Sequence, residues 1–554
     1  MAPVPRSGTP EKASALPPTA PAEDATAAAP RRASARGLLI AAAGALVVAL
    51  LFLAYLRASR TYPENSDESN DLLMAWDMLH GNVLLHGWYL SDVSFITTEL
   101  PQYALLVWLF GLHTDTAHIA AAMTYTLVVI LSVLLARGRV SRREARARML
   151  LTAGLMFAPQ LGVGVFVLLL SLGHIGTAVP LLLTWLVIDR CPARWFVAVA
   201  VGLLLTWVLI ADPLVLLAGV VPLVAVCVMR VVRALAQRQD ATVRAVLRTR
   251  WYELSLAVAA VAAWGLAWLA GHLVQADLHP VPYHLAPVHT WPKHAWVTAK
   301  GLFALFGAKP EGPPAAFAFA LLHLAGVALV AWAVLRVARR FLSWPDMISQ
   351  ILLVAMIVNV AAYVPSTLAN ATDLNAREFA VVLPFGAVLA GRTLAVSLLD
   401  SKRRWARPAL LAGAAGLLLV GYGVSLGWAA AQPSVSPMNA RLATFLSAHH
   451  LTSGIGGYWE SSVVTVGSDG AVTIRSVRPA TLKPNLWEAK SSWYDAGPNY
   501  ANFLVTSSAP GFFNHWQPNR AALAALGTPA RTYHVGPYTV YVWNKNLLAE
   551  LAHH

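Results

Sequence analysis

Charged side chains are scarce in this chain. Only 12% of its 554 residues are Asp, Glu, Lys or Arg, whereas 57% are hydrophobic. Soluble domains carry about twice that share of charge. The mean hydropathy of +0.57 points the same way. These values exclude an ordinary soluble protein and predict a polytopic membrane protein with one additional domain.

Cysteine is even rarer, with Cys191 and Cys227 the only two. Both lie in or beside apolar segments, so we expect neither a disulfide framework nor a cysteine-based metal site. Acidic residues are outnumbered by basic ones, 27 to 41, which gives a net charge of +14. The basic residues form short clusters between apolar segments, as orientation signals do, so no nucleic-acid partner is expected.

Long apolar segments are what the chain has in abundance. Each is near the length that crosses about 30 Å of hydrocarbon, and only a helical bundle satisfies so many apolar backbones in lipid. The predicted fold is therefore a polytopic α-helical membrane protein with about eleven transmembrane helices. They are expected at 37–56, 116–136, 149–171, 174–189, 195–211, 213–229, 254–273, 315–335, 348–365, 379–399 and 408–430.

Alternate loops differ in Arg and Lys, which predicts the orientation. The basic loops contain residues 31–36, 137–148, 190–194, 230–250, 336–340 and 402–407. Such loops face the cytoplasm. The N-terminus is then inside, and residues 1–36, rich in Ala, Pro, Ser and Arg, are expected to be a disordered cytoplasmic tail. The Ala-, Arg- and Pro-rich composition is typical of a GC-rich bacterium such as an actinobacterium, so the membrane is expected to be a bacterial plasma membrane.

The last segment, 431–554, changes character. Short β-branched and aromatic runs at 463–466, 471–474, 503–506 and 538–543 predict strands, and the turn at 468–470 predicts a hairpin. We expect a small α/β domain here, and the predicted orientation makes it extracytoplasmic. The domain boundaries are thus 1–36, 37–430 and 431–554.

Acidic residues are concentrated in the outer loop 57–115. Under 40 positions contain Glu64, Asp67, Glu68, Asp71, Asp77, Asp92 and Glu99. Apolar residues at near-helical spacing over 72–85 predict amphipathic helices at the membrane interface, and 101–112 is too short to span and predicts another. Ion or proton chemistry is expected beside this loop.

The loop resembles the first outer loop of the GT-C superfamily, integral-membrane glycosyltransferases that use polyprenyl-phosphate sugar donors. The match to the protein-mannosyltransferase and aminoarabinose-transferase branches consists of Asp67-Glu68, Ala75, Gly81 and Asp92. The chain has Glu99-Leu-Pro where the family often has His-x-Pro-Pro, so the resemblance fixes neither subfamily nor acceptor.

A second segment, 376–386, resembles the Arg-Tyr-Leu-Leu-Pro segment that opens a late span in the same superfamily. Arg377 matches its arginine, and Glu378 stands at the tyrosine position. The resemblance implies a GT-C-like transmembrane domain at 37–430 with its catalytic loop at 57–115.

Glycosyl transfer from a lipid phosphate needs a base for the acceptor hydroxyl and a cation for the leaving phosphate. Asp67, at the mouth of the first span, is the predicted base, with Asp92 and Glu99 in support. Arg377 is the predicted phosphate ligand, and interfacial snorkelling is its structural alternative.

Further substrate contacts are expected from residues at other outer turns. His174 and Asp212 lie between spans, where polar residues are often functional, although Asp212 before Pro213 also suits a helix cap. Trp88 lies in the acidic loop, and Lys293 lies in a His-rich loop, 272–294. No cofactor is assigned with certainty, and a divalent metal ion stays open.

The predicted function is transfer of a sugar from a polyprenyl-phosphate donor to a cell-envelope glycan, lipid or protein on the outer face. Partners are then the donor, membrane lipid and the acceptor. Two alternatives remain: a transporter or lipid flippase, and a catalytically inactive GT-C-like scaffold. A transporter needs charges or broken helices at the midplane, and the predicted span centres are nearly free of charge.

Overall fold

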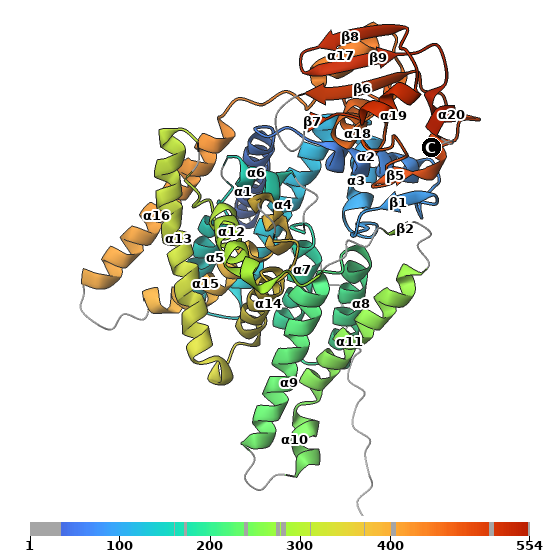
Figure 1. The fold of residues 1–554 in the computed structure, drawn as a ribbon. Helices are drawn as coiled ribbons and strands as arrows, with labels where there is room; N and C mark the ends of the chain where they lie inside the picture. The colour runs from blue at the N-terminus through green and yellow to red at the C-terminus, as the bar shows by residue number, and fades with distance from the viewer. Residues whose placement is uncertain are drawn as a thin grey trace, which may run out of the picture. The chain divides into compact units, whose positions relative to one another are not determined.

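The computed structural model describes residues 35–159, 161–170, 174–237, 242–272, 277–278, 284–310, 312–369, 372–399, 406–508 and 515–551. The chain divides into two compact units, Met1–Ala49 and Leu50–His554. The first unit contains the described start of α1 (Ala35–Ser59), and the second contains everything that follows (Figure 1). The predicted tail 1–36 lies almost wholly outside the described residues.

The described chain up to Ala430 is mostly helical. Its α-helices after α1 are α2 (Ser66–Leu79), α3 (Glu99–Phe110), α4 (Thr114–Arg137), α5 (Arg142–Leu155), α6 (Val163–Leu169), α7 (Ala178–Arg190), α8 (Trp195–Ala211), α9 (Val221–Ala236), α10 (Val243–Thr249), α11 (Trp251–Gly271), α12 (Trp291–Leu305), α13 (Pro314–Arg339), α14 (Met347–Tyr363), α15 (Val382–Leu399) and α16 (Ala406–Ala430). A π-helical turn, η1 (Leu216–Val220), precedes α9, and a 3₁₀ segment, η4 (Asp373–Phe379), precedes α15.

Several of these helices can cross a membrane. Five described segments are long and apolar enough: Gly37–Ser59, Thr114–Arg137, Leu216–Ala236, Trp251–Gly271 and Pro314–Arg339. The bent pair of η4 and α15, with 59° between its parts, makes up to six. The chain is therefore a multi-pass membrane protein, with fewer full-length spans among the described residues than the eleven predicted.

The predicted single span over 149–171 is wrong. Helix α5 ends at Leu155 and α6 begins at Val163. Between them lie Pro159 and Gly162, whose φ is 74°. Proline has no amide hydrogen to donate, and a left-handed residue cannot continue a right-handed helix. The apolar run is therefore divided into two shorter helices.

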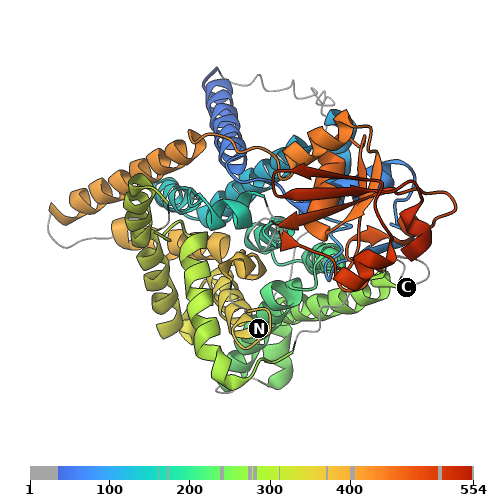
Figure 2. The same ribbon diagram turned by 45° about the horizontal axis from the view of Figure 1, so that its top comes forward.

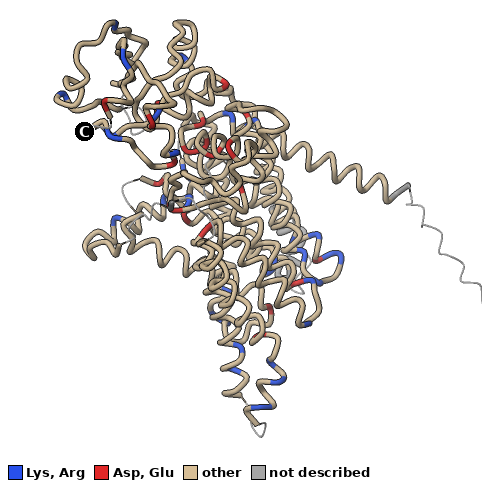
Figure 3. The backbone as a smooth tube through the Cα atoms, turned by 90° about the vertical axis from the view of Figure 1, so that its right-hand side faces the viewer, with Lys and Arg blue, Asp and Glu red and all other residues tan. Residues whose placement is uncertain are grey.

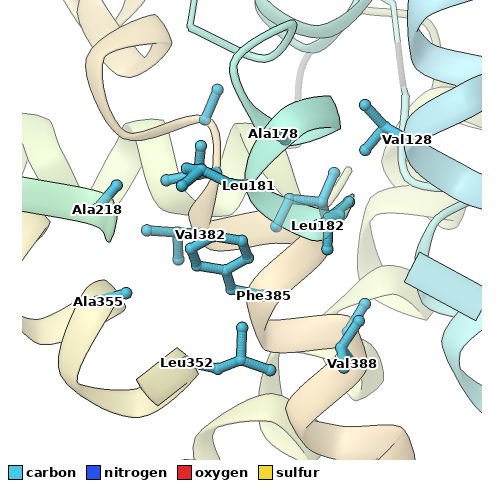
Figure 4. Close-up of a cluster of buried hydrophobic side chains, with 14 of the residues drawn as sticks. Val128, Ala178, Leu181, Leu182, Ala218, Leu352, Ala355, Val382, Phe385 and Val388 are labelled. Atoms are coloured by element: carbon cyan, nitrogen blue, oxygen red, sulfur yellow. The ribbon is translucent and has the colours of Figure 1, made fainter. Parts of the chain in front are cut away.

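The helices share a large apolar core. Figure 4 shows side chains from α4, α7, η1, α14 and α15 meeting around Phe385, which is fully buried. Small residues such as Ala178, Ala218 and Ala355 lie among the larger ones. Alternating large and small side chains allow such helices to pack closely.

The outer loop 57–115 is itself folded. Helix α2 packs against α3, and Leu72, Trp88 and Leu100 belong to a second buried apolar cluster between them. Helices are thus present in both predicted segments, although α2 ends at Leu79, and their position at the membrane interface stays a prediction. A short strand, β1 (Trp88–Leu90), follows α2.

The C-terminal part contains a mixed sheet with helices on both faces (Figure 2). The strand order is β4-β3-β6-β9-β8, with β7 also paired to β6; β3 is parallel to β4 and β6, and the β6–β9 and β8–β9 pairs are antiparallel. The elements are α17 (Ala440–Ala448), β3 (Ser453–Gly456), α18 (Tyr458–Gly467), β4 (Thr473–Ser476), β6 (Phe503–Ser508), β7 (His515–Trp516), α19 (Arg520–Ala525), β8 (Arg531–Val535), β9 (Tyr538–Val542) and α20 (Leu547–Leu551).

One predicted hairpin in this part is wrong. Positions 463–466 belong to α18 rather than to a strand, and β4 runs parallel to β3. Val463 and Val464 are fully buried between this helix and the sheet. Burial against a sheet has therefore overridden the β propensity of the valines. The strands predicted at 503–506 and 538–543 are confirmed by β6 and β9.

The C-terminal part is joined to the outer loop by direct contacts within the second unit. Helix α18 packs on α2. Strand β5 (Ala489–Lys490) pairs antiparallel with β1, which also pairs in parallel with β2 (Asp277–Leu278). These contacts position residues that are nearly 400 positions apart around one site.

Candidate functional site

A cavity of about 590 Å³ lies where the outer loop, η4 and the C-terminal part meet. Four residues that the sequence analysis selected line it: Asp67, Asp92, His174 and Arg377. They come from α2, the segment after β1, the turn before α7, and η4. The cavity therefore assembles residues from segments that are remote in sequence.

Asp67 is presented by the first turn of α2. The Asn65 side chain accepts a hydrogen bond from the Asp67 amide at 2.8 Å, and Glu68 accepts one from the Asn65 amide at 2.8 Å. This reciprocal capping box fixes the start of the helix. Asp67 therefore lies in the first turn of a well-capped helix, where a negatively charged side chain suits the helix dipole.

Arg377 faces two carboxylates. Its Nη1 atom lies 3.5 Å from Asp67 Oδ2, and its Nε atom lies 3.7 Å from Glu378 Oε1. The side chain is 35% exposed, so part of the guanidinium remains accessible from the cavity. An accessible arginine in such a place can form a bidentate pair with a phosphate.

His174 lies between two buried carboxylates. Its Nδ1 atom is 2.7 Å from Asp212 Oδ2, and its Nε2 atom is 3.0 Å from Glu378 Oε2. Thr177 also donates to Asp212. Burial lowers the pKa of His174, but Asp212 and Glu378 together raise it well above its ordinary value. The His174 imidazolium thus holds Glu378 at the cavity wall. Asp212 contacts the other ring nitrogen of His174 and does not itself line the cavity.

Asp92 adds a further carboxyl group to the wall. Burial raises its pKa, and the charge of Glu378 raises it further. Asp71 is buried more deeply, and burial together with the charge of Glu488 raises the pKa of Asp71 well above its ordinary value. Several carboxyl groups therefore share this cavity in unequal environments.

The C-terminal part contributes a second group of side chains. The Tyr458 hydroxyl lies 2.8 Å from Asp67 Oδ1 and also contacts Glu488 Oε2. Asn70 Nδ2 lies 3.1 Å from the same hydroxyl and 3.2 Å from Glu488 Oε2. Trp459 and Trp487 line the cavity beside them, with Asn485.

The other selected residues do not line this cavity. Asp212 supports His174 from behind. Trp88 is 1% exposed and donates from Nε1 to Asp77 at 2.8 Å, so it braces β1. Lys293 is exposed on α12. Glu99 is buried at the start of α3 and lines a separate cavity of about 250 Å³, where one of its oxygens fills the space that a side chain at Gly176 would need.

Several cavity residues were not selected from the sequence. Asp71 lies one helical turn after Asp67, a spacing that places both on one face of α2. Glu378 was noted only as a departure from a motif. Tyr458 and Glu488 belong to the C-terminal part, where no sequence signal connected them to the acidic loop. The adjacent Trp-Glu pair at 487–488 in a polar stretch is the one hint.

No three His, Cys, Asp or Glu side chains among the described residues are grouped so that they could hold a metal ion. His279 of the His-rich loop lies outside the described residues, and His294 contacts the carbonyl of Val364 at 3.1 Å. The cavity thus has one arginine, one histidine and several carboxyl groups as its charged components.

Acidic and basic residues also separate along the second unit. In Figure 3 the acidic residues concentrate next to the C-terminal part, whereas Lys and Arg are frequent at the far ends of the helices. The membrane side that each end faces stays a prediction.

No protein-family profile matches the chain, and no curated protein is similar to it in sequence. ArnT from Cupriavidus metallidurans in the apo state is similar in structure, with a TM-score of 0.50 at 13% identity over 91% of this chain and 98% of that chain. The same protein bound to undecaprenyl phosphate gives a TM-score of 0.48 at 14% identity over 92% of this chain and 98% of that chain.

The Archaeoglobus fulgidus oligosaccharyltransferase tethered with an acceptor peptide gives a TM-score of 0.47 at 13% identity, over 84% of this chain and 69% of that chain. These structural neighbours are GT-C glycosyltransferases. At this level of identity the similarity concerns the fold alone. The comparison with apo ArnT shows that the fold of this chain is GT-C-like.

Proposed function

We propose that the protein is a GT-C-type glycosyltransferase that moves a sugar from a polyprenyl-phosphate donor to a cell-envelope glycan, lipid or protein on the outer face of the membrane. The observation that carries the proposal is the cavity in which Asp67 Oδ2 lies 3.5 Å from Arg377 Nη1. A candidate base and a candidate phosphate ligand thus lie in one cavity, as this reaction requires.

In the proposed reaction the acceptor hydroxyl oxygen attacks C1 of the donor sugar. A bond forms between that oxygen and C1, and the bond between C1 and the phosphate oxygen breaks, with its electron pair going to the phosphate. Asp67 accepts the hydroxyl proton. Arg377 stabilises the negative charge that develops on the departing polyprenyl phosphate.

The remaining walls suit a sugar. Trp459 and Trp487 offer apolar aromatic surface, and Asp92 and Asn485 offer polar groups for hydroxyls. Ligand pockets commonly combine apolar walls with a few polar groups that fix orientation. The many carboxyl groups disfavour an acidic sugar, because its negative charge would be repelled.

Asp67→Asn tests the proposal directly. The purified protein in detergent is incubated with labelled hexosyl and pentosyl polyprenyl phosphates, and release of polyprenyl phosphate with transfer to envelope acceptors is measured. Loss of the base is expected to lower turnover by about 10²- to 10⁴-fold. The matched control is Asp469→Asn, an exposed turn residue in the C-terminal part.

Equal turnover in Asp67→Asn and wild type would remove Asp67 as the base. Absence of transfer with every donor in the correctly folded wild-type protein would instead favour the inactive scaffold. Transport of the lipid without glycosyl transfer would favour the flippase alternative.

A further inference from the structure

The Tyr458 hydroxyl group has a single hydrogen but faces two carboxyl groups. It lies 2.8 Å from Asp67 Oδ1 and in shorter contact with Glu488 Oε2. Asn70 Nδ2 lies 3.1 Å from the hydroxyl and 3.2 Å from Glu488 Oε2. Ser462 donates to Asn70 Oδ1, which directs the Asn70 amide group toward Tyr458 and Glu488.

Counting hydrogens shows what this arrangement needs. Asn70 can donate one hydrogen to Tyr458 and one to Glu488. Tyr458 has one hydrogen, so it can donate to Asp67 or to Glu488 but not to both. If both carboxyl groups were ionised, one of the two contacts would place lone pairs against lone pairs. An additional proton is therefore required in the trio.

We propose that Glu488 carries this proton and donates a hydrogen bond to the Tyr458 hydroxyl, which in turn donates a hydrogen bond to the Asp67 carboxylate. Tyr458 and Glu488 are then positioning residues for Asp67. They hold the Asp67 carboxylate in one orientation. They also keep it ionised, so that it can accept the proton from the acceptor hydroxyl. The C-terminal part thus completes the catalytic site. This inference rests on the proposed function.

The surroundings of Glu488 support its neutral form. Its side chain is buried, and burial raises its pKa to about 8, with Asp67 raising it further. The groups that face it are Asp67 and Asp71 from α2, Tyr458 from α18, and Arg377 from η4. Hydrogen bonds from Tyr458 and Asn70 and the charge of Arg377 lower the pKa of Glu488, but burial and the charge of Asp67 outweigh them. Arg377 also faces Asp67 and Glu378.

The backbone of Glu488 is also held in an uncommon conformation. Its φ is 48°, in the left-handed region, and it directly precedes β5, whose pairing with β1 fixes it. On the other side, Ser66 donates to the Tyr458 carbonyl at 2.6 Å. Left-handed non-glycine residues are costly and often occur at functional sites. The main chains of Tyr458 and Glu488 are therefore both anchored to the outer loop.

The test compares pH profiles of kcat in four proteins: wild type, Glu488→Gln, Glu488→Ala and Tyr458→Phe. Wild-type activity is expected to fall above about pH 8 as Glu488 loses its proton. Glutamine keeps an N–H donor to Tyr458 but loses the oxygen that accepts from Asn70, so Glu488→Gln is expected to keep clearly more activity at pH 7 than Glu488→Ala and to lose the alkaline fall. Glu488→Ala and Tyr458→Phe are expected to lose roughly 10-fold or more. Glu550→Gln is the control, since Glu550 lies on α20 outside the cavity.

An alkaline fall in Glu488→Gln like that of wild type would overturn the proposal, as would a loss at pH 7 equal to that of Glu488→Ala. These two readouts still decide if Glu488→Ala fails to fold. A second measurement needs no turnover. Infrared difference spectra of Glu488→Gln against wild type at pH 7 are expected to lose the C=O stretch of one protonated carboxyl group. If that band is unchanged, Glu488 is ionised and the inference fails, whatever the enzyme catalyses. If the band is lost but no donor is turned over, the proposed function alone fails.

Discussion

The Nη1 atom of Arg377 lies 3.5 Å from Oδ2 of Asp67, although 310 positions separate the two residues in sequence. In the proposed reaction these side chains bind different groups, the acceptor hydroxyl and the donor phosphate. A phosphate that draws Arg377 away also releases the Asp67 carboxylate. Donor binding would thus prepare the base for the acceptor.

Replacing Arg377 is expected to affect donor binding most. Arg377→Ala should raise KM for the polyprenyl-phosphate sugar by about 10-fold or more, because the phosphate loses a charge-assisted pair. Arg377→Lys should restore part of the donor affinity, since lysine supplies the charge but not the planar guanidinium group. Lys293→Ala is the control, because Lys293 is exposed and does not line the cavity. An unchanged KM in Arg377→Ala would contradict the phosphate assignment.

The His174–Asp212 pair is expected to contribute to stability in a defined pH range. Asp212→Asn removes a buried charge partner, which typically costs about 3 kcal/mol. Burial raises the pKa of Asp212, but His174 lowers it below the ordinary value. The stability that the ionised Asp212 provides is therefore lost in acid. The raised pKa of His174 means that its contribution is complete below the ordinary value of 6.5 and is lost as pH rises through the folded pKa.

Thermal unfolding in detergent at pH 6 and at pH 10 checks this prediction. The deficit of Asp212→Asn should be largest at pH 6 and smaller at pH 10. Asp115→Asn is the matched control, since its ion pair with Arg60 is about one third exposed and should contribute less than about 1 kcal/mol. A deficit of equal size at both pH values would contradict the proposed charge state of His174.

Local sequence patterns predicted the part of the site that lies near the start of helices and spans. Asn65 and Glu68 form a capping box that can be read from their spacing, and this box presents Asp67. The acidic loop and the late arginine were recognisable by composition and order. Convergence of Asp67 and Arg377 in one cavity depends on helix packing, which sequence order alone does not determine.

The contribution of the C-terminal part could not be predicted in the same way. The valines after Ser462 have high β propensity, so α18 was expected to be a strand, and its first residue, Tyr458, was not expected to reach α2. Side-chain direction was a second limit. Trp88 and Glu99 belong to the acidic loop, but Trp88 lies in a packed apolar cluster and Glu99 lines a separate cavity. Composition identifies a loop, whereas tertiary packing determines which of its side chains face the substrate.

Arg392 joins four helices and is expected to be critical for stability. It contacts Asp346 at 2.8 Å and Asp189 at 2.8 Å, and it donates to the Leu135 carbonyl at 2.6 Å. Arg392→Ala leaves the buried Asp189 carboxylate and the partly exposed Asp346 carboxylate without this partner and should destabilise the protein by roughly 3–5 kcal/mol. Thermal unfolding of the purified protein measures this loss. Arg340→Ala, an exposed change, should stay within about 0.5 kcal/mol, and an equally small effect at Arg392 would contradict the proposed role.

Glu99 gives the sharpest contrast between a structural and a catalytic carboxyl group. Both of its oxygens are buried without a hydrogen-bond partner among the described residues, and burial raises its pKa from 4.5 to about 7. The folded protein therefore holds this proton more tightly than the unfolded chain. Its contribution to stability is complete below pH 4.5 and falls as pH rises through 7, by an amount on the order of 3 kcal/mol.

Glu99→Gln, which stays uncharged, should remove this pH dependence. Thermal unfolding midpoints of wild type and Glu99→Gln are compared at pH 5 and at pH 8.5, and the variant should gain on wild type at the higher pH. Turnover distinguishes the two roles. A structural carboxyl group predicts that Glu99→Gln keeps activity at pH 7, where the native side chain is about half protonated. If Glu99 instead acts on the substrate, as the sequence predicts, the same variant must lose activity at every pH, because glutamine cannot exchange a proton.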